Sequence, residues 1–153
     1  MTGPMTGAMT GPMTGTGAGG VPLPLAGQVR AELDRFVAAI GPRRTLVPRL
    51  YVGAPGGERI RIPDEAGTGP REAGWRADLV ERGVSGVDRP VCGWITRSGD
   101  LAPSDHDIAW CGATRDAFAR HGLALPGFFV LNRHGWADIL SGDRVHYHRI
   151  RRR

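Results

Sequence analysis

The sequence predicts one α/β domain, in which a mixed β-sheet is flanked by helices. Three observations carry this prediction. Segments with helical and strand periodicity alternate from residue 25 to residue 150 in the order α-β-β-α-β-α-β-β-β, which is typical of helices packed on a mixed sheet. Residues 127–132 (GFFVLN) form the most apolar run and suit a central strand that is covered on both faces. The chain has 153 residues, 41% of them hydrophobic, which suits a single core with tails.

The chain opens with a low-complexity segment. Residues 1–16 repeat the unit MTGX four times, without a charge, an aromatic ring or a branched aliphatic side chain. Such a segment cannot bury enough apolar surface to offset the entropy lost on ordering. We therefore expect residues 1–24 to be disordered, the folded domain to span residues 25–148, and residues 149–153 to form a basic tail.

The individual elements follow from hydrophobic periodicity and from glycine and proline breaks. The expected helices are 25–40, 75–82 and 104–121, ended by Gly41, Gly83 and Gly122. The expected strands are 45–52, 58–62, 89–96, 127–132, 136–140 and 145–150. Side-chain alternation in the third strand places Cys92, Trp94 and Thr96 on one face and Val91, Gly93 and Ile95 on the other. Within the first strand, Pro48 indicates an edge or a bulge.

The charge of the chain is concentrated at its C-terminus. All 20 basic residues are arginine and the net charge is +5. Residues 143–153 hold five arginines and one aspartate and so carry +4 of that charge, which leaves the rest of the chain near neutral. This distribution indicates a basic tail rather than a broad basic face. The tail arginines predict at most weak, salt-dependent contact with nucleic acid phosphates, through Arg149, Arg151, Arg152 and Arg153.

Hydropathy and cysteine content limit the class of protein further. The sequence shows neither an apolar run long enough to span a membrane nor a secretion signal, so we expect a cytoplasmic protein without membrane contact. Its two cysteines, Cys92 and Cys111, fit no zinc or disulfide framework. Burial as small hydrophobic residues is the favoured interpretation, with a regulatory disulfide between them as the alternative.

One stretch, SGDLAPSDHDIAW at residues 98–110, admits two interpretations. Ser104 and Asp107 have the S-x-x-D spacing of a capping box, in which each side chain binds the backbone N–H of the other at a helix start. The same pair is also half of a metal-hydrolase motif. The capping function alone is favoured, since acidic side chains are stabilised at a helix N-terminus.

The order of elements, together with residues 94–107, resembles the JAB/MPN domain, the JAMM metalloprotease fold, including its bacterial RadC-like branch. The family motif is H-x-H, seven residues, S, two residues, D. Its four positions fall on Trp94, Thr96, Ser104 and Asp107. The loop SGDLAPS is also similar to the RadC-like SGDPxPS loop. The resemblance covers roughly residues 25–140 and implies a cytidine-deaminase-like layering of helices on the sheet.

The resemblance implies a degenerate zinc site. In the family, two histidines and the aspartate hold zinc, with a water in the fourth position. Here Trp94 cannot ligate and Thr96 is a poor ligand, so Asp107 alone is too little. The family's general-base glutamate on the first strand also has no counterpart between Pro42 and Gly57, where arginines stand instead. We expect Trp94 to fill the lost zinc pocket, or else to line a groove for a partner peptide.

These observations favour a catalytically inactive JAB/MPN-like domain, without a cofactor, that acts as a scaffold for a protein partner. The family groove grips an extended peptide beside a sheet edge, and that mode needs no metal. One alternative is a zinc-dependent peptidase- or isopeptidase-like hydrolase with substituted ligands, drawn from His106, Asp107, His146 and His148. A second alternative is a RadC-like accessory protein that contacts DNA through the arginine tail.

Overall fold

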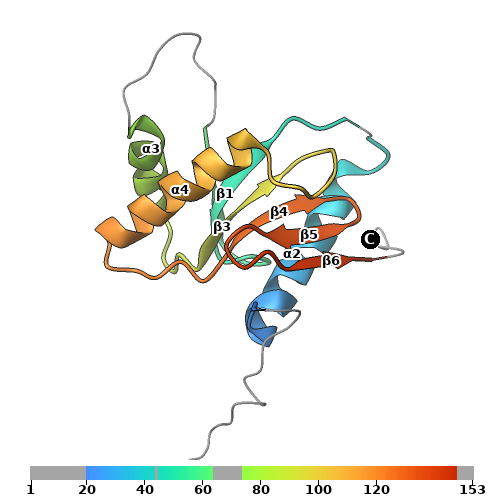
Figure 1. The fold of residues 1–153 in the computed structure, drawn as a ribbon, viewed down its shortest axis with the longest axis horizontal. Helices are drawn as coiled ribbons and strands as arrows, with labels where there is room; N and C mark the ends of the chain where they lie inside the picture. Colours follow the sequence, from blue (N-terminus) through green and yellow to red (C-terminus); the bar gives the residue numbers. More distant parts are fainter. Residues whose placement is uncertain (1–19, 44, 64–73, 148–153) are drawn as a thin grey trace, which may run out of the picture.

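The chain folds around one six-stranded mixed β-sheet, with helices on both faces (Figure 1). A computed structural model describes residues 20–43, 45–63 and 74–147. In this part of the chain the helices are α2 (Leu23–Ile40), α3 (Trp75–Ser85) and α4 (Asp105–Arg120). The strands are β1 (Arg49–Gly53), β2 (Arg59–Ile62), β3 (Cys92–Thr96), β4 (Phe128–Asn132), β5 (Gly135–Asp138) and β6 (Arg144–His146). The predicted α/β class and order of elements are confirmed.

The strands lie side by side in the order β2-β1-β3-β4-β5-β6. β3 and β4 are parallel, because α4 carries the chain back across the sheet between them. Each of the other neighbouring pairs is antiparallel and follows a short connection or joins β1 to β3. β3 and β4 are buried along their whole length, which confirms the central position expected for residues 127–132.

The two faces of the sheet have separate apolar cores. α2 covers one face, where its apolar stripe packs against Cys92, Trp94 and Phe129. α3 and α4 cover the other face, where Trp110 and Phe118 pack against Ile95 and Phe128. The predicted alternation along β3 is therefore confirmed for Cys92, Trp94 and Ile95. Val91 differs: it precedes the strand and packs with the α2 side.

The two cysteines belong to opposite cores, Cys92 to the α2 side and Cys111 to the α4 side. The sheet separates them, so the alternative of a disulfide between them is wrong, and both are free buried thiols as favoured. Burial raises the pKa of the Cys92 thiol well above its usual range and that of Cys111 to about 11. Neither thiol is therefore activated as a nucleophile.

The ends of α4 match the sequence prediction. Ser104 Oγ accepts the Asp107 N–H at 3.1 Å, and Asp107 Oδ2 accepts the Ser104 N–H at 2.9 Å, which completes the capping box. At the other end Gly122 adopts a φ of 68°, and the N–H of Leu123 donates to the Phe118 carbonyl. This is a Schellman ending, which favours glycine because of its positive φ.

The end of α3 differs from the prediction. The helix continues past Gly83 to Ser85, and Gly86 supplies the C-cap. Gly83 instead faces β2, where a Cβ atom would overlap the side chain of Ile62. This glycine therefore permits close packing of α3 on the sheet and does not end the helix. The connection 64–73, which precedes α3, lies outside the described residues.

The start of the folded domain also differs from the prediction, because residues 20–24 are ordered. Val21 is fully buried, and the N–H groups of Gly20 and Val21 donate to the Asp143 carboxylate. α2 begins at Leu23, since prolines are tolerated in the first helical turn, where backbone N–H groups have no partner within the helix. Residues 1–19 lie outside the described part of the chain.

Several strands are shorter than expected. β1 begins only at Arg49, because Pro48 cannot donate and the Leu46 N–H is bound by the Ser98 side chain instead. β3 begins at Cys92 rather than at residue 89. β5 ends at Asp138, whose buried carboxylate accepts the N–H groups of the turn that follows. In the described residues, the helices are too short or too polar to cross a membrane.

Candidate functional site

Two adjacent regions at the end of β3 contain the charged side chains that are candidates for a functional site. Side chains on neighbouring strand positions point to opposite faces. Thr96 is the last residue of β3 and lies on the side of α2. Arg97 follows it and turns toward the start of α4, where Asp107 lies. Each region is described in turn.

The first region, the closed site, consists of Arg97, Asp107 and the connection 98–104. The guanidinium of Arg97 binds both carboxylate oxygens of Asp107, with Nη2 at 2.8 Å from Oδ2 and Nε at 3.2 Å from each oxygen. The Asp107 side chain is fully buried and that of Arg97 is 11% exposed. A buried, bidentate pair of this kind is strongly coupled to the fold, since removing one partner leaves a buried charge.

The remaining donors of Arg97 organise the connection to α4. Its Nη1 donates to the carbonyl oxygens of Ser98 and Asp100, at 2.9 and 2.7 Å, and Nη2 donates to that of Ala102 at 3.0 Å. All five N–H groups of the guanidinium are therefore bonded inside the protein. Arg97 thus fixes the path of the loop that delivers Asp107 to its position.

The four positions compared with the JAB/MPN motif make other contacts in this structure. Ser104 and Asp107 lie together, as predicted; Oδ2 of Asp107 accepts from Arg97 Nη2 and from the Ser104 N–H, and Oδ1 accepts from Arg97 Nε. Trp94 is 1% exposed and stacks on Tyr51, with ring centroids 5.9 Å apart. It is part of the α2-side core and is not among the residues that line the adjacent hollow.

The alternative metal ligands are also scattered. Nδ1 of His106 lies 4.0 Å from an Asp107 oxygen, whereas His146 is exposed on the outermost strand β6. His148 lies outside the described residues, as do the four arginines of the tail at 149–153. Within the described residues, no group of three or more histidine, cysteine, aspartate or glutamate side chains could hold a metal ion.

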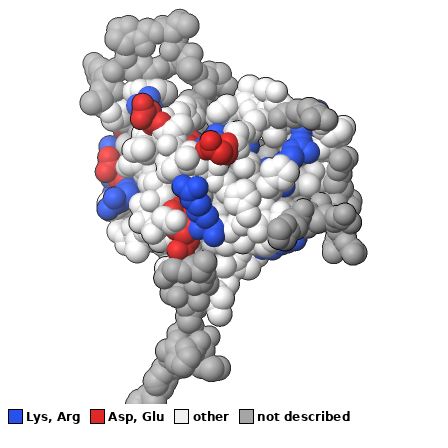
Figure 2. Space-filling view, turned by 45° about the vertical axis from the view of Figure 1, so that its right-hand side comes forward, with Lys and Arg blue, Asp and Glu red and all other residues white. Residues whose placement is uncertain are grey.

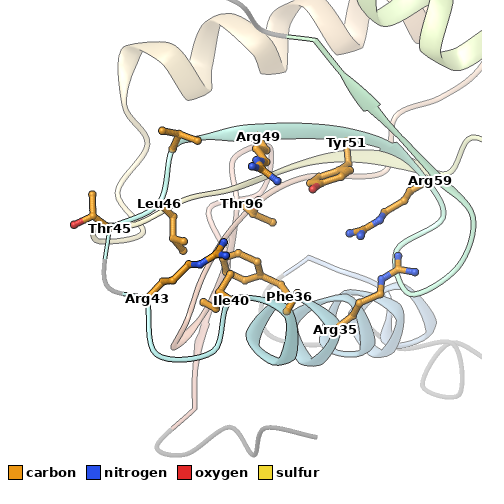
Figure 3. A pocket seen from close by; sticks show the side chains of 12 residues that line it. Arg35, Phe36, Ile40, Arg43, Thr45, Leu46, Arg49, Tyr51, Arg59 and Thr96 are labelled. Carbon is orange, nitrogen blue, oxygen red and sulfur yellow. The ribbon is translucent and has the colours of Figure 1, made fainter.

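The second region, the arginine hollow, lies between α2 and the face of β1 (Figure 3). It has a volume of about 320 Å³, within the range of small ligand sites. Four arginines from separate segments point into it: Arg35 from α2, Arg43 from the connection to β1, Arg49 from the start of β1, and Arg59 from β2. Its apolar and uncharged polar lining comes from Phe36, Ala39, Ile40, Thr45, Leu46, Val47, Tyr51 and Thr96.

One end of the hollow is neutralised by Glu32, a fully buried residue of α2. Its carboxylate pairs with Arg35 and, at 2.6 Å, with Nη1 of Arg59, and it accepts the Gly56 N–H at 2.8 Å. The turn of the β1–β2 hairpin is thereby attached to α2. Arg59 also lies over the Tyr51 ring, 4.4 Å from its centroid, which orients both side chains.

The other end of the hollow keeps its charge. Arg43 and Arg49 are exposed, and no carboxylate of the described residues forms an ion pair with either of them. Between them, the N–H of Leu46 donates to the Ser98 side chain, which fixes this part of the connection to the end of β3. The segment between Pro42 and Gly57, in which the sequence has no carboxylate, therefore supplies positive charge to the hollow.

Two residues that carry these sites, Arg97 and Glu32, were not identified from the sequence. The sequence could have indicated Arg97, because it is a basic residue between an apolar strand and an acidic helix start. The sequence indication for Glu32 is weaker: it is an acidic residue next to Leu33 and Phe36 in the apolar stripe of the first helix. Its partners, Gly56 and Arg59, are distant in sequence and are revealed only by the fold.

Comparison with known proteins identifies no relative. The chain matches no family model, no curated protein and no solved structure.

Proposed function

We propose that this chain is a catalytically inactive JAB/MPN-like domain that binds a protein partner. The observation that carries the proposal is the pairing of Arg97 with both oxygens of Asp107. Asp107 stands at the position where the family resemblance expects a metal ligand. An arginine that holds this carboxylate puts a positive charge where the metal would lie, so cation binding is opposed by repulsion as well as by the shortage of ligands.

The other family positions support the same proposal. Trp94 fills its site with an indole ring that packs on Tyr51, and Thr96 offers only a neutral hydroxyl. Filling the pocket restores close packing that an empty metal site would lack. The closed site therefore retains the outline of an active site as a structural element, in which the metal's place is taken by a guanidinium.

The arginine hollow supports the binding part of the proposal. It is open, it carries charge that the described residues do not neutralise, and Val47 on its rim is 67% exposed. No other large apolar side chain of the described residues is as exposed. Exposed apolar surface beside arginines that no described carboxylate pairs with is typical of interfaces with other proteins.

A hydrolysis assay tests the absence of catalysis. The purified chain, supplied with zinc, is incubated with peptide and isopeptide-linked substrates beside a chelator-treated sample and Asp107→Asn. The proposal expects all three to equal the rate without protein. Turnover that is lost with the chelator and with Asp107→Asn would contradict it and would favour the hydrolase with substituted ligands.

Site-specific photo-crosslinking in cells tests the binding part. A photoreactive residue replaces Val47 on the hollow or, as a matched control, Ile108, which is 54% exposed on α4. The proposal expects one defined protein adduct from position 47 that is absent from position 108. Equal adducts from both positions, or none from position 47, would contradict docking at the hollow.

A further inference from the structure

We infer that the arginine hollow binds an acidic, extended peptide segment of the partner, with its carboxylates on Arg43 and Arg49 and an apolar side chain between them and α2. This inference rests on the proposed protein-binding function and specifies the chemistry of the bound segment. It is carried by three features of the described residues: the charge imbalance, the apolar wall and the exposed Val47.

The charge imbalance selects an anion. Four guanidinium groups face one hollow, and the described residues supply one carboxylate to them, that of Glu32, which pairs with Arg35 and Arg59. Arg43 and Arg49 at the other end therefore repel one another. A bound anion would lower this repulsion. Arginine presents a planar fork of donors that matches a carboxylate on two oxygens, so each can hold one acidic side chain.

The apolar wall favours a peptide over a simple anion. Phe36, Ile40 and Leu46 line the hollow between the two pairs of arginines, and Val47 is exposed on the rim (Figure 3). Phosphate or pyrophosphate would make no use of this surface. An extended segment in which two acidic residues and an apolar one stand at alternate positions uses both, because alternate side chains of an extended chain lie on the same side and are roughly 7 Å apart.

The surface charge disfavours a nucleic acid as the occupant. Nucleic acids require a long basic stripe that follows the phosphate backbone. On the face shown in Figure 2, red carboxylates mostly stand close to the blue arginine side chains, so positive charge is not continuous over the described residues in view. A local hollow with two unneutralised arginines is better matched to a short acidic segment.

Fluorescence anisotropy with the full chain tests the inference. The probe is a labelled, blocked peptide of sequence Glu-Leu-Glu-Glu-Leu-Glu, beside the same peptide with glutamine in place of glutamate. We expect the glutamate peptide to bind at least about tenfold more tightly, and its affinity to fall as salt rises from 50 to 300 mM, roughly as screening of exposed charges requires. Equal binding of the two peptides, or no binding of either, would overturn the inference.

Variants locate the site. The double variant Arg43→Glu with Arg49→Glu should bind the glutamate peptide at least about tenfold more weakly than the wild type. The control double variant, Arg115→Glu with Arg144→Glu, changes two exposed residues outside the hollow and should alter the affinity less than about threefold. Ala39→Glu keeps every arginine but adds a carboxylate to the hollow, and it should also weaken binding. Equal effects of the hollow and control pairs would place the binding elsewhere and overturn the inference.

Competition separates the other occupants. Val47→Thr keeps the shape of the side chain but replaces a methyl group with a hydroxyl. This variant should bind the glutamate peptide more weakly and should bind pyrophosphate with unchanged affinity. If pyrophosphate or a single-stranded oligonucleotide displaces the peptide at lower concentration than unlabelled peptide does, the hollow is a phosphate site and the inference fails. If the peptide experiments fail but the chain holds no zinc, only the acidic-peptide inference is lost and the proposal of an inactive domain stands. If the chain shows hydrolysis that depends on Asp107, the proposal of an inactive domain is lost instead.

Discussion

Thr96 and Arg97 are neighbours in sequence, yet their side chains lead to two regions that use arginine in opposite ways. In the closed site, one guanidinium has all five donors bonded and its charge matched by a buried carboxylate. In the arginine hollow, four guanidinium groups face a single carboxylate of the described residues, that of Glu32, which pairs with two of them. The first arrangement is complete without a ligand, while the second leaves two arginines that no described carboxylate pairs with.

The closed site is expected to stabilise the fold, whereas the exposed arginines of the hollow are expected to take part in binding. A buried charge with a full set of partners is costly to disturb, so substitutions in the closed site should appear as lost stability. Exposed charges contribute little to stability, so substitutions of Arg43 or Arg49 should appear as changed binding. Predictions at Arg97, at Glu32 and at the pair Arg43 and Arg49 test this division, and a fourth, at Cys111, tests burial on the α4 side; they run from the largest expected effect to the smallest.

The largest effect is expected at Arg97. Arg97→Ala leaves the Asp107 carboxylate buried without its partner and releases three loop carbonyls, so the free energy of unfolding should fall by about 3–5 kcal/mol. Arg97→Lys keeps the charge but not the fork of donors and should recover only part of the loss. Urea unfolding followed by circular dichroism measures all variants. If Arg97→Ala is within about 0.5 kcal/mol of the wild type, the closed site is not the structural element described here.

A smaller effect on stability is expected at Glu32, a buried residue that also neutralises one end of the arginine hollow. Glu32→Gln keeps the shape of the buried side chain but removes the charge that pairs with Arg35 and Arg59. The unfolding free energy should fall by about 1–3 kcal/mol, because hydrogen bonds to a charged group are lost. The same variant should bind the acidic peptide more tightly, since the hollow becomes more positive. A loss of both stability and peptide affinity in a folded variant would contradict the assigned charge balance.

The buried thiol of α4, on the side of the closed site, predicts a pH effect. The pKa of Cys111 is about 11 in the folded protein, against an ordinary value of 9.0, because burial disfavours the thiolate. Its contribution to stability is fully present below pH 9 and is lost as the pH rises to 11, since the unfolded chain gives up the proton first. Cys111→Ala should therefore lose less stability than the wild type between pH 8 and 10.5. Parallel pH profiles from thermal unfolding of the two proteins would contradict this assignment.

The smallest effect on stability is expected in the hollow. Arg43→Gln with Arg49→Gln should change the free energy of unfolding by no more than about 0.5 kcal/mol, because both side chains are exposed. At low salt the variant should be slightly more stable than the wild type, since repulsion is removed, and this difference should shrink as salt is added. A loss above about 1.5 kcal/mol would show that these arginines hold the fold.

The sequence was most informative where the signal is local. The order of elements, the opposite faces of Trp94 and Ile95 and the capping box at Ser104 all follow from periodicity or from residues a few positions apart. Errors arose where a distant partner decides the outcome. Gly83 suggested a helix end, but it lies within the helix because β2 packs against it.

The candidate sites show the same limit. The absence of zinc-ligand residues at positions 94 and 96 is visible in the sequence, and so is the run of arginines before β1. The pairing of Arg97 with Asp107 required the structure, since ten positions separate the two residues and the loop must fold back to join them. The hollow required it as well, because its four arginines come from three elements and one connection.

The zinc content of the purified chain tests the central claim most directly. Protein produced without a histidine tag, in medium with added zinc, is dialysed and measured by mass spectrometry of the metal. We expect less than about a tenth of an equivalent per chain, because a carboxylate that is already held by Arg97 does not retain zinc against dialysis. One equivalent of zinc that Asp107→Asn abolishes would show instead that Asp107 is a metal ligand.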